Sequence, residues 1–389
     1  MLALRLARGS HPLVLARRLL VSCASAGVGF LLLSTLGHAA GNPAQATGSV
    51  LRLLWCLVPL AATVQFAVAV ARTDPSTRPR AGLSAVGLGP VRLSVLAAVS
   101  TAVATTLGSM VALLFFLHLR GDLRGLPFDG GAAAFLGAGT PLPLPAALTL
   151  LALVPVTASV ASALALRSRP EVPAPEEPLS AEAPLSPVPA PSGLPWGVAL
   201  AAAGLAVEAY ASRGSGGSPF PLPGRLDSTP AGVLAGWVLT AIGLAMAGPG
   251  LTHLCGRLLQ SARPGAARLL AGRVLMDESR RIGRPLGIVC AVVSGAIAAT
   301  ALYEEGTRPY GPLTALGAVL VLGCTTASLL TSAIEAKQDR VRTAEALRRM
   351  GAHASVLRSA TALRAASLLL MFAPLTWVLA QLAALPLSG

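Results

Sequence analysis

Charged residues, and lysine in particular, are scarce in this chain. Only 12% of its 389 residues are charged, about half the share that is usual for a soluble domain, whereas 54% are hydrophobic. Arginine supplies all but one of the 30 basic residues, and Lys337 is the exception. Although the formal net charge is +14, no arginine-rich face is interleaved with aromatic residues, so we expect no nucleic-acid partner. The scarcity of charge excludes an ordinary soluble domain.

The residue patterns that support nucleotide, metal or disulfide chemistry are also missing. A phosphate-binding loop contains Gly-Lys-Ser/Thr, but the single lysine stands in an Ala-Lys-Gln context. The five cysteines lie in or beside apolar stretches without paired spacing, which is typical of packing residues. The five histidines are scattered and form no His-x-x-x-His pair. We therefore expect no metal, no other cofactor and no enzymatic activity in this chain itself.

What the sequence does contain is a series of long apolar stretches. Crossing the hydrocarbon core of a bilayer takes about 20 apolar residues, and the backbone in lipid must form its hydrogen bonds internally, so such stretches are helices. The sequence predicts an all-α, polytopic integral membrane protein with about nine transmembrane helices. The predicted spans lie near residues 19–38, 51–71, 93–117, 143–166, 195–212, 231–252, 285–303, 312–334 and 362–386.

The fifth span is the weakest, because it is short and contains Glu208. This residue is the only acid inside a predicted span, and intramembrane acids often serve as substrate or proton sites. The simpler interpretation is an interfacial residue or a misplaced helix boundary, because no second acid lies in another span to form a relay and Arg52 and Arg364 stand at the ends of theirs.

The distribution of arginine predicts the orientation. With the N-terminus inside, the inner segments hold 24 of the 30 basic residues and the outer segments hold 6. We therefore expect a cytoplasmic N-terminus and, after nine spans, an extracytoplasmic C-terminus. Arg17 and Arg18 before an apolar run imitate a signal peptide, but eight further spans favour an uncleaved first helix. The arginine bias, together with abundant Ala, Gly and Pro, suggests a bacterial cell membrane.

Two sequence patterns that recur at nearly the same spacing indicate an internal duplication. Arg5 with Arg17-Arg18 recurs as Arg268 with Arg280-Arg281, a shift of 263 residues. The segment 78–89 aligns with 342–353 at a shift of 264, which pairs Arg78, Leu83 and Gly87 with Arg342, Leu347 and Gly351. The predicted domains are a first four-span unit (1–167), a Pro/Glu-rich cytoplasmic linker (168–194), two linking spans (195–260) and a second unit of three spans (261–389), whose fourth span is apparently missing.

The segment KQDRVRTAEALRRMGA (337–352) is too charged to enter a bilayer and too prone to form helix to be a simple loop. Ala344, Leu347 and Gly351 share one helical face, and Glu345 precedes Arg349 by four residues, which is a favourable ion-pair spacing. A short amphipathic helix between spans suits docking to a soluble partner. A solvated basic loop that obeys the positive-inside rule is the alternative.

This pattern resembles the FtsX-like permease family of ABC transporters in its duplicated form. That family has a cytoplasmic segment of the form E-x-A-x-L-R-A-x-G-A after the second span of a unit, and Glu345 to Ala352 offer its counterpart, whereas the first unit has Ala81 in place of the glutamate. The resemblance implies a membrane-spanning permease subunit that couples ATP hydrolysis by a separate ATPase dimer to movement of its helices. The implied ATPase-coupling residues are Arg342, Glu345, Leu347, Arg348, Arg349, Met350 and Gly351, with Arg78, Leu83 and Gly87 as their first-unit equivalents.

Two other functions remain open. A non-transporting membrane scaffold or sensor, such as a degenerate permease, fits the missing span. A secondary transporter is less favoured, because broken helices and midplane charges are not evident. The sequence does not identify a substrate.

Overall fold

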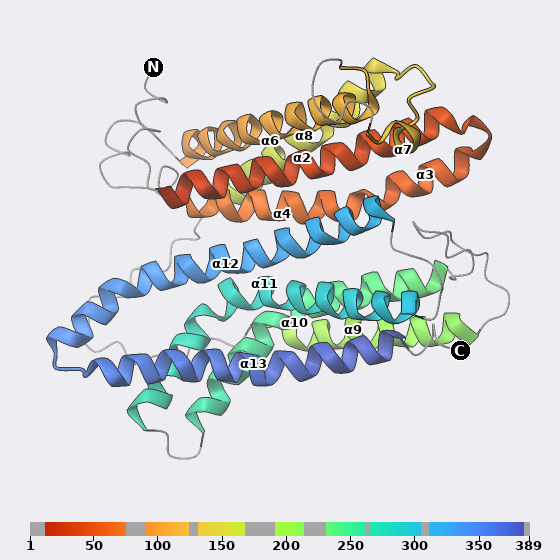
Figure 1. The fold of residues 1–389 in the computed structure, drawn as a ribbon. Coiled ribbons are helices and arrows are strands. Elements are labelled where there is room, and N and C mark those ends of the chain that lie inside the picture. The colour runs from red at the N-terminus through yellow and green to blue at the C-terminus, as the bar shows by residue number, and fades with distance from the viewer. Residues whose placement is uncertain are drawn as a thin grey trace. The chain divides into compact units, whose positions relative to one another are not determined.

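The computed structural model describes residues 12–74, 90–123, 131–167, 191–213, 231–261, 265–304 and 311–384. Almost all of these residues are helical, and none of them forms a β-strand, which confirms the predicted all-α class (Figure 1). A short 3-10 turn, η1, covers Pro43–Gln45. The α-helices are α2 (Pro12–Gly41), α3 (Ala46–Trp55), α4 (Leu57–Thr73), α6 (Pro90–Arg120), α7 (Ala133–Leu136), α8 (Leu144–Leu166), α9 (Gly193–Arg213), α10 (Ala231–Gln260), α11 (Ala266–Glu304), α12 (Pro312–Arg349) and α13 (Ala354–Ala384).

Within the described residues, nine helical stretches are long and apolar enough to cross a membrane. Each overlaps one of the nine predicted spans, and α3 and α4 together form the second of them. The stretch Gly193–Ala211, predicted to be the weakest, is the least apolar of the nine. The chain is therefore a multi-pass membrane protein, as its composition predicts.

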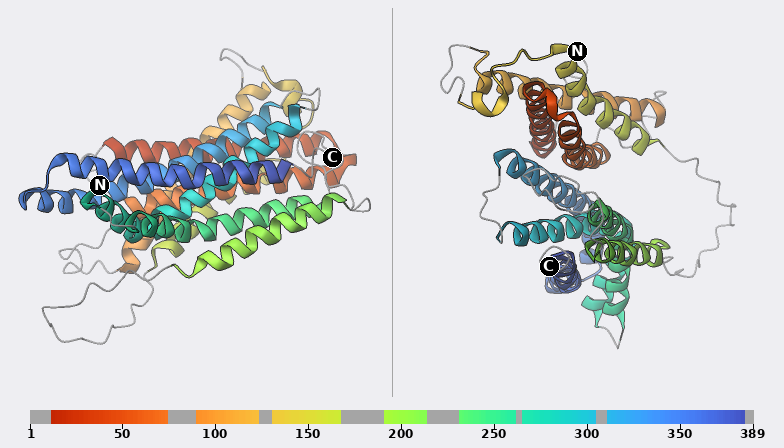
Figure 2. Two further views of the ribbon diagram at one scale, coloured as in Figure 1. Left: turned by 90° about the horizontal axis from the view of Figure 1, so that it is seen from below. Right: turned by 90° about the vertical axis from the view of Figure 1, so that its right-hand side faces the viewer.

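The described helices form two compact units. The first contains α2 to α8 together with Gly311–Cys324, the start of α12. Its helices α2, α4, α6 and α8 lie side by side (Figure 2). The hydroxyl groups of Ser22 and Ser25 donate across the α2–α6 contact to the carbonyl oxygens of Ala104 and Thr105, at 2.8 and 2.7 Å. Small residues and interhelical hydrogen bonds of this kind hold helices together in lipid.

The second unit contains α9, α10, α11, α13 and the part of α12 from Thr325 onward. Helix α10 packs between α9 and α11, and α13 packs against α11. Glycines permit the close approach of α9 and α10: a Cβ atom added to Gly197 or Gly204 would lie 2.7 Å from the carbonyl oxygen of Gly243 or Gly236. Larger side chains at these positions would force the two helices apart.

Helices α11 and α12 extend well beyond their predicted spans. At about 1.5 Å per residue, the 38 residues of α12 reach about 57 Å, whereas a hydrocarbon core is about 30 Å thick. The segment 337–349 is therefore the end of α12 (Figure 1). The sequence had suggested a separate short helix instead. Helix propensity explains the continuity, because residues 334–349 contain neither glycine nor proline to end the helix.

Gly351 lies just beyond Arg349, the last residue of α12, and ends the helix. Its φ angle of 94° lies in the left-handed region, which favours glycine. The N–H groups of Gly351 and Ala352 donate to the carbonyl oxygens of Arg348 and Leu347, both at 3.0 Å. This is the Schellman arrangement, and it turns the chain sharply into α13.

Candidate functional site

The charged end of α12, residues Lys337–Arg349, is the segment to which the sequence assigns a role. Its burial follows the helical repeat: Leu347 is half-buried, whereas Glu345, Arg348 and Arg349 are exposed. Just beyond it, Met350 is 76% exposed. Within the segment, Val341 is 47% exposed, so charged and apolar side chains lie together at the surface of this unit.

Two ion pairs join this charged end to α11. Arg281 Nη1 lies 2.7 Å from Asp339 Oδ2, and Arg340 Nε lies 3.2 Å from Glu278 Oε1. The side chains of the second pair are the more buried, at 29% exposure for Arg340 and 14% for Glu278. The two pairs use residues three positions apart on α11, about one helical turn, and adjacent residues on α12, so both restrain α12 against α11 at the same place.

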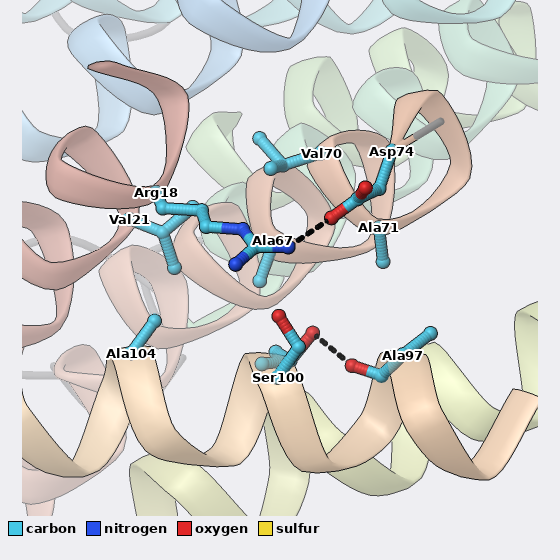
Figure 3. Close-up of a pocket in the computed structure, with 10 residues that line it drawn as sticks. Arg18, Val21, Ala67, Val70, Ala71, Asp74, Ala97, Ser100 and Ala104 are labelled. Atoms are coloured by element: carbon cyan, nitrogen blue, oxygen red, sulfur yellow. Dashed lines mark hydrogen bonds and ion pairs between the residues drawn. The ribbon is translucent and has the colours of Figure 1, made fainter. Parts of the chain in front are cut away.

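The first unit contains a matching ion pair. Arg18 Nη2, near the start of α2, lies 2.5 Å from Asp74 Oδ2, immediately after the end of α4 (Figure 3). Beside it lies a cavity of about 20 Å³, enough for a single water molecule. The two residues are 56 positions apart, compared with 58 for Arg281 and Asp339. In both units, an arginine on one helix thus pairs with an aspartate that follows the next apolar span.

Of the remaining predicted coupling residues, only Arg342 lies in a described helix, α12. Arg78, Leu83 and Gly87 lie outside the described residues, as do residues 168–190 of the predicted linker. Their assignments therefore remain predictions.

Sequence reasoning missed the acidic partners Asp74, Glu278 and Asp339. The recurrence of Arg17-Arg18 as Arg280-Arg281 could have indicated the two aspartates, because Asp74 and Asp339 follow those arginines at nearly equal intervals. No sequence pattern indicated Glu278, because its partner Arg340 lies 62 positions later in the chain and only the fold brings the two together.

Glu208 lies in the second unit, on α9. Its side chain is 1% exposed and faces the interior of the unit. Trp237 Nε1, on α10, donates a hydrogen bond of 2.5 Å to Glu208 Oε1. The close crossing of Gly204 with Gly236 positions both residues, since each follows one of these glycines within a helical turn. Sequence reasoning selected Glu208 but not Trp237, which is 29 residues away.

Groups of three or more His, Cys, Asp or Glu side chains that could hold a metal ion do not occur among the described residues. At the charged end of α12, exposed charges lie on a helix that two ion pairs attach to α11. Comparisons of the chain with protein-family models, with curated proteins and with solved structures give no match.

Proposed function

We propose that this chain is the membrane-spanning permease subunit of an ABC transporter. In this proposal, a separate ATPase dimer docks on the predicted cytoplasmic side and drives movement of the membrane helices. The residues that make the contact are Arg342, Glu345, Leu347 and Arg348 of the charged end of α12, with Met350 just beyond it. The protein resides in a bacterial cell membrane with its N-terminus in the cytoplasm.

The observation that carries this proposal is the continuity of α12 from an apolar span into its charged end. A helix that runs without a break from the membrane into a docking surface transmits displacement along its whole length, whereas a flexible loop would absorb it. The two ion pairs to α11 couple that displacement to a second membrane helix. A solvated basic loop, the alternative for this segment, would need neither feature.

The matching ion pairs, Arg18–Asp74 and Arg281–Asp339, support a duplicated architecture. They join the same kinds of positions, an arginine on one helix and an aspartate at the end of the next apolar span. Two equivalent docking sites, one in each unit, would suit a dimeric ATPase. The segment 78–89 would then be the first-unit counterpart of the charged end.

The proposal is tested by reconstitution. The full chain is co-expressed with each ABC-type ATPase encoded in its own genome, and ATP hydrolysis is measured in lipid nanodiscs. We expect one ATPase to co-purify stoichiometrically and to hydrolyse ATP at a rate that depends on the chain. A photo-crosslinking residue at Met350 should then attach to that ATPase, and one at Ala44, an exposed position of η1 on the predicted outer side, should not.

A charge-reversal variant separates docking from folding. Exchanging Glu345→Arg and Arg349→Glu keeps opposite charges at the i,i+4 spacing, which contributes at most about 0.3–0.5 kcal/mol, so the helix should persist. The surface offered to the partner is changed, so ATPase binding and stimulated hydrolysis should fall. Unchanged coupling in this variant would remove the charged end from the mechanism, and failure of every ATPase to associate would favour a scaffold or sensor.

A further inference from the structure

A cavity of about 180 Å³ lies inside the second unit, among α9, α10, α11 and α13. Glu208 and Trp237 border it on one side, and Ser294 and Gly295 of α11 border it on another. Val238, which is 58% exposed, also contributes to its wall, so the cavity reaches the surface of this unit. It is separate from the charged end of α12 and plays no part in the proposed coupling to an ATPase.

Glu208 is the unusual member of this wall. Its Oε1 atom accepts the hydrogen bond from Trp237, but its Oε2 atom is buried and has no hydrogen-bond partner among the described residues. An ionised carboxylate without a compensating partner is costly to bury. Acids retained inside membrane segments commonly mark a functional site for this reason. A ligand in the adjoining cavity would supply the missing partner.

The polar groups around the cavity specify the kind of ligand. The hydroxyl of Thr240 donates to the carbonyl oxygen of Ala201 at 3.5 Å, and that of Ser294 donates to Ala291 at 2.9 Å. The hydroxyl hydrogen of Ser294 is therefore engaged, and its oxygen lone pairs remain as acceptors. None of the described lining residues is basic. The cavity thus offers acceptors, a carboxylate and an indole ring, which together suit a ligand that brings N–H donors and positive charge.

We propose that this cavity binds a small organic ammonium ion, with the ammonium group at Glu208 and the apolar part against Trp237 and Leu244. The size agrees with this class, since a cavity of about 150 Å³ holds benzene and this one is slightly larger. The apolar lining from Leu244, Leu379 and neighbouring alanines accommodates a single aromatic ring or a short alkyl chain. A strongly hydrated inorganic ion would find too few oxygen ligands.

The experiment compares a charged ligand with its neutral analogue. Saturable binding of radiolabelled benzylammonium and of benzyl alcohol is measured on the full chain in lipid nanodiscs. We expect benzylammonium to bind about tenfold or more tightly than the alcohol, because hydrogen bonds to charged groups are the stronger ones. Glu208→Gln retains an acceptor for Trp237 but removes the charge, and it should abolish this preference while leaving binding of the alcohol unchanged.

Two further variants keep the test decisive. A Cβ added to Gly295 meets no atom within 4 Å, so Gly295→Leu extends into the cavity, and both ligands should lose saturable binding. Asp277→Asn, at an exposed acid on α11, is the matched control and should bind as the parent protein does. Equal affinity for the two ligands in the parent chain, or a charge preference that survives in Glu208→Gln, would overturn the proposal. If Glu208→Gln does not fold, the Gly295→Leu variant and the ligand comparison on the parent chain still decide it.

Discussion

Of the two ion pairs between α11 and α12, the longer one should be the stronger. The Arg281–Asp339 pair is the shorter, at 2.7 Å, but its side chains are 62% and 40% exposed. The Arg340–Glu278 pair is longer, at 3.2 Å, and its side chains are 29% and 14% exposed. Water screens an exposed pair, and the side chains lose entropy on pairing, so such pairs contribute about 0.2–1 kcal/mol.

The more buried pair is expected to contribute more. Burial lowers the effective dielectric constant around Arg340 and Glu278 and so strengthens their attraction. Arg340 Nε donates its hydrogen bond to the carbonyl oxygen of Ala336, at 2.9 Å, so its contact with Glu278 is an ion pair. We therefore expect a coupling free energy of about 1 kcal/mol for Glu278 with Arg340, the upper limit for partly exposed pairs, and about 0.5 kcal/mol for Arg281 with Asp339.

The assay is a double-mutant cycle for each pair. The single and double alanine variants of Glu278 and Arg340, and of Arg281 and Asp339, are unfolded with SDS in mixed micelles, and each coupling energy is the departure from additivity. Raising the salt concentration should weaken the Arg281–Asp339 coupling more, since screening acts most strongly on exposed charges. Equal couplings, or a larger coupling for Arg281 with Asp339, would refute the reasoning that burial sets their strength.

Three further predictions concern topology and glycine. A reporter fused after Gly389 should behave as extracytoplasmic and one inserted at Ser180 as cytoplasmic; a cytoplasmic reporter at Gly389 would contradict the orientation inferred from arginine. Gly204→Leu should lower the free energy of unfolding by at least about 1–3 kcal/mol through overpacking of α9 against α10, whereas Gly323→Ala, which meets no atom within 4 Å, should not destabilise the protein in the same SDS titration. Gly351→Val places a branched side chain at a φ of 94° and should cost about 1–2 kcal/mol; an unaltered SDS midpoint would show that this turn carries no strain.

The sequence by itself determined which segments are helices and that they belong in a membrane. A backbone in lipid must form its hydrogen bonds internally, so a run of about 20 apolar residues has a single outcome whatever its neighbours are. All nine predicted spans follow from this constraint and coincide with helices. The left-handed turn at Gly351 was predictable for a similar reason, because only the local backbone conformation decides which residue can end the helix.

The tertiary structure alone decided which side chains meet. The run of apolar residues that predicts a span does not say which of its faces turns to another helix, because lipid is as apolar as the neighbouring helix. The fold therefore brought Trp237 to Glu208 and Arg340 to Glu278, pairs that the spacing in the sequence does not reveal. The close approach of glycines on α9 and α10 brought the first pair together, and the uninterrupted length of α12 brought the second.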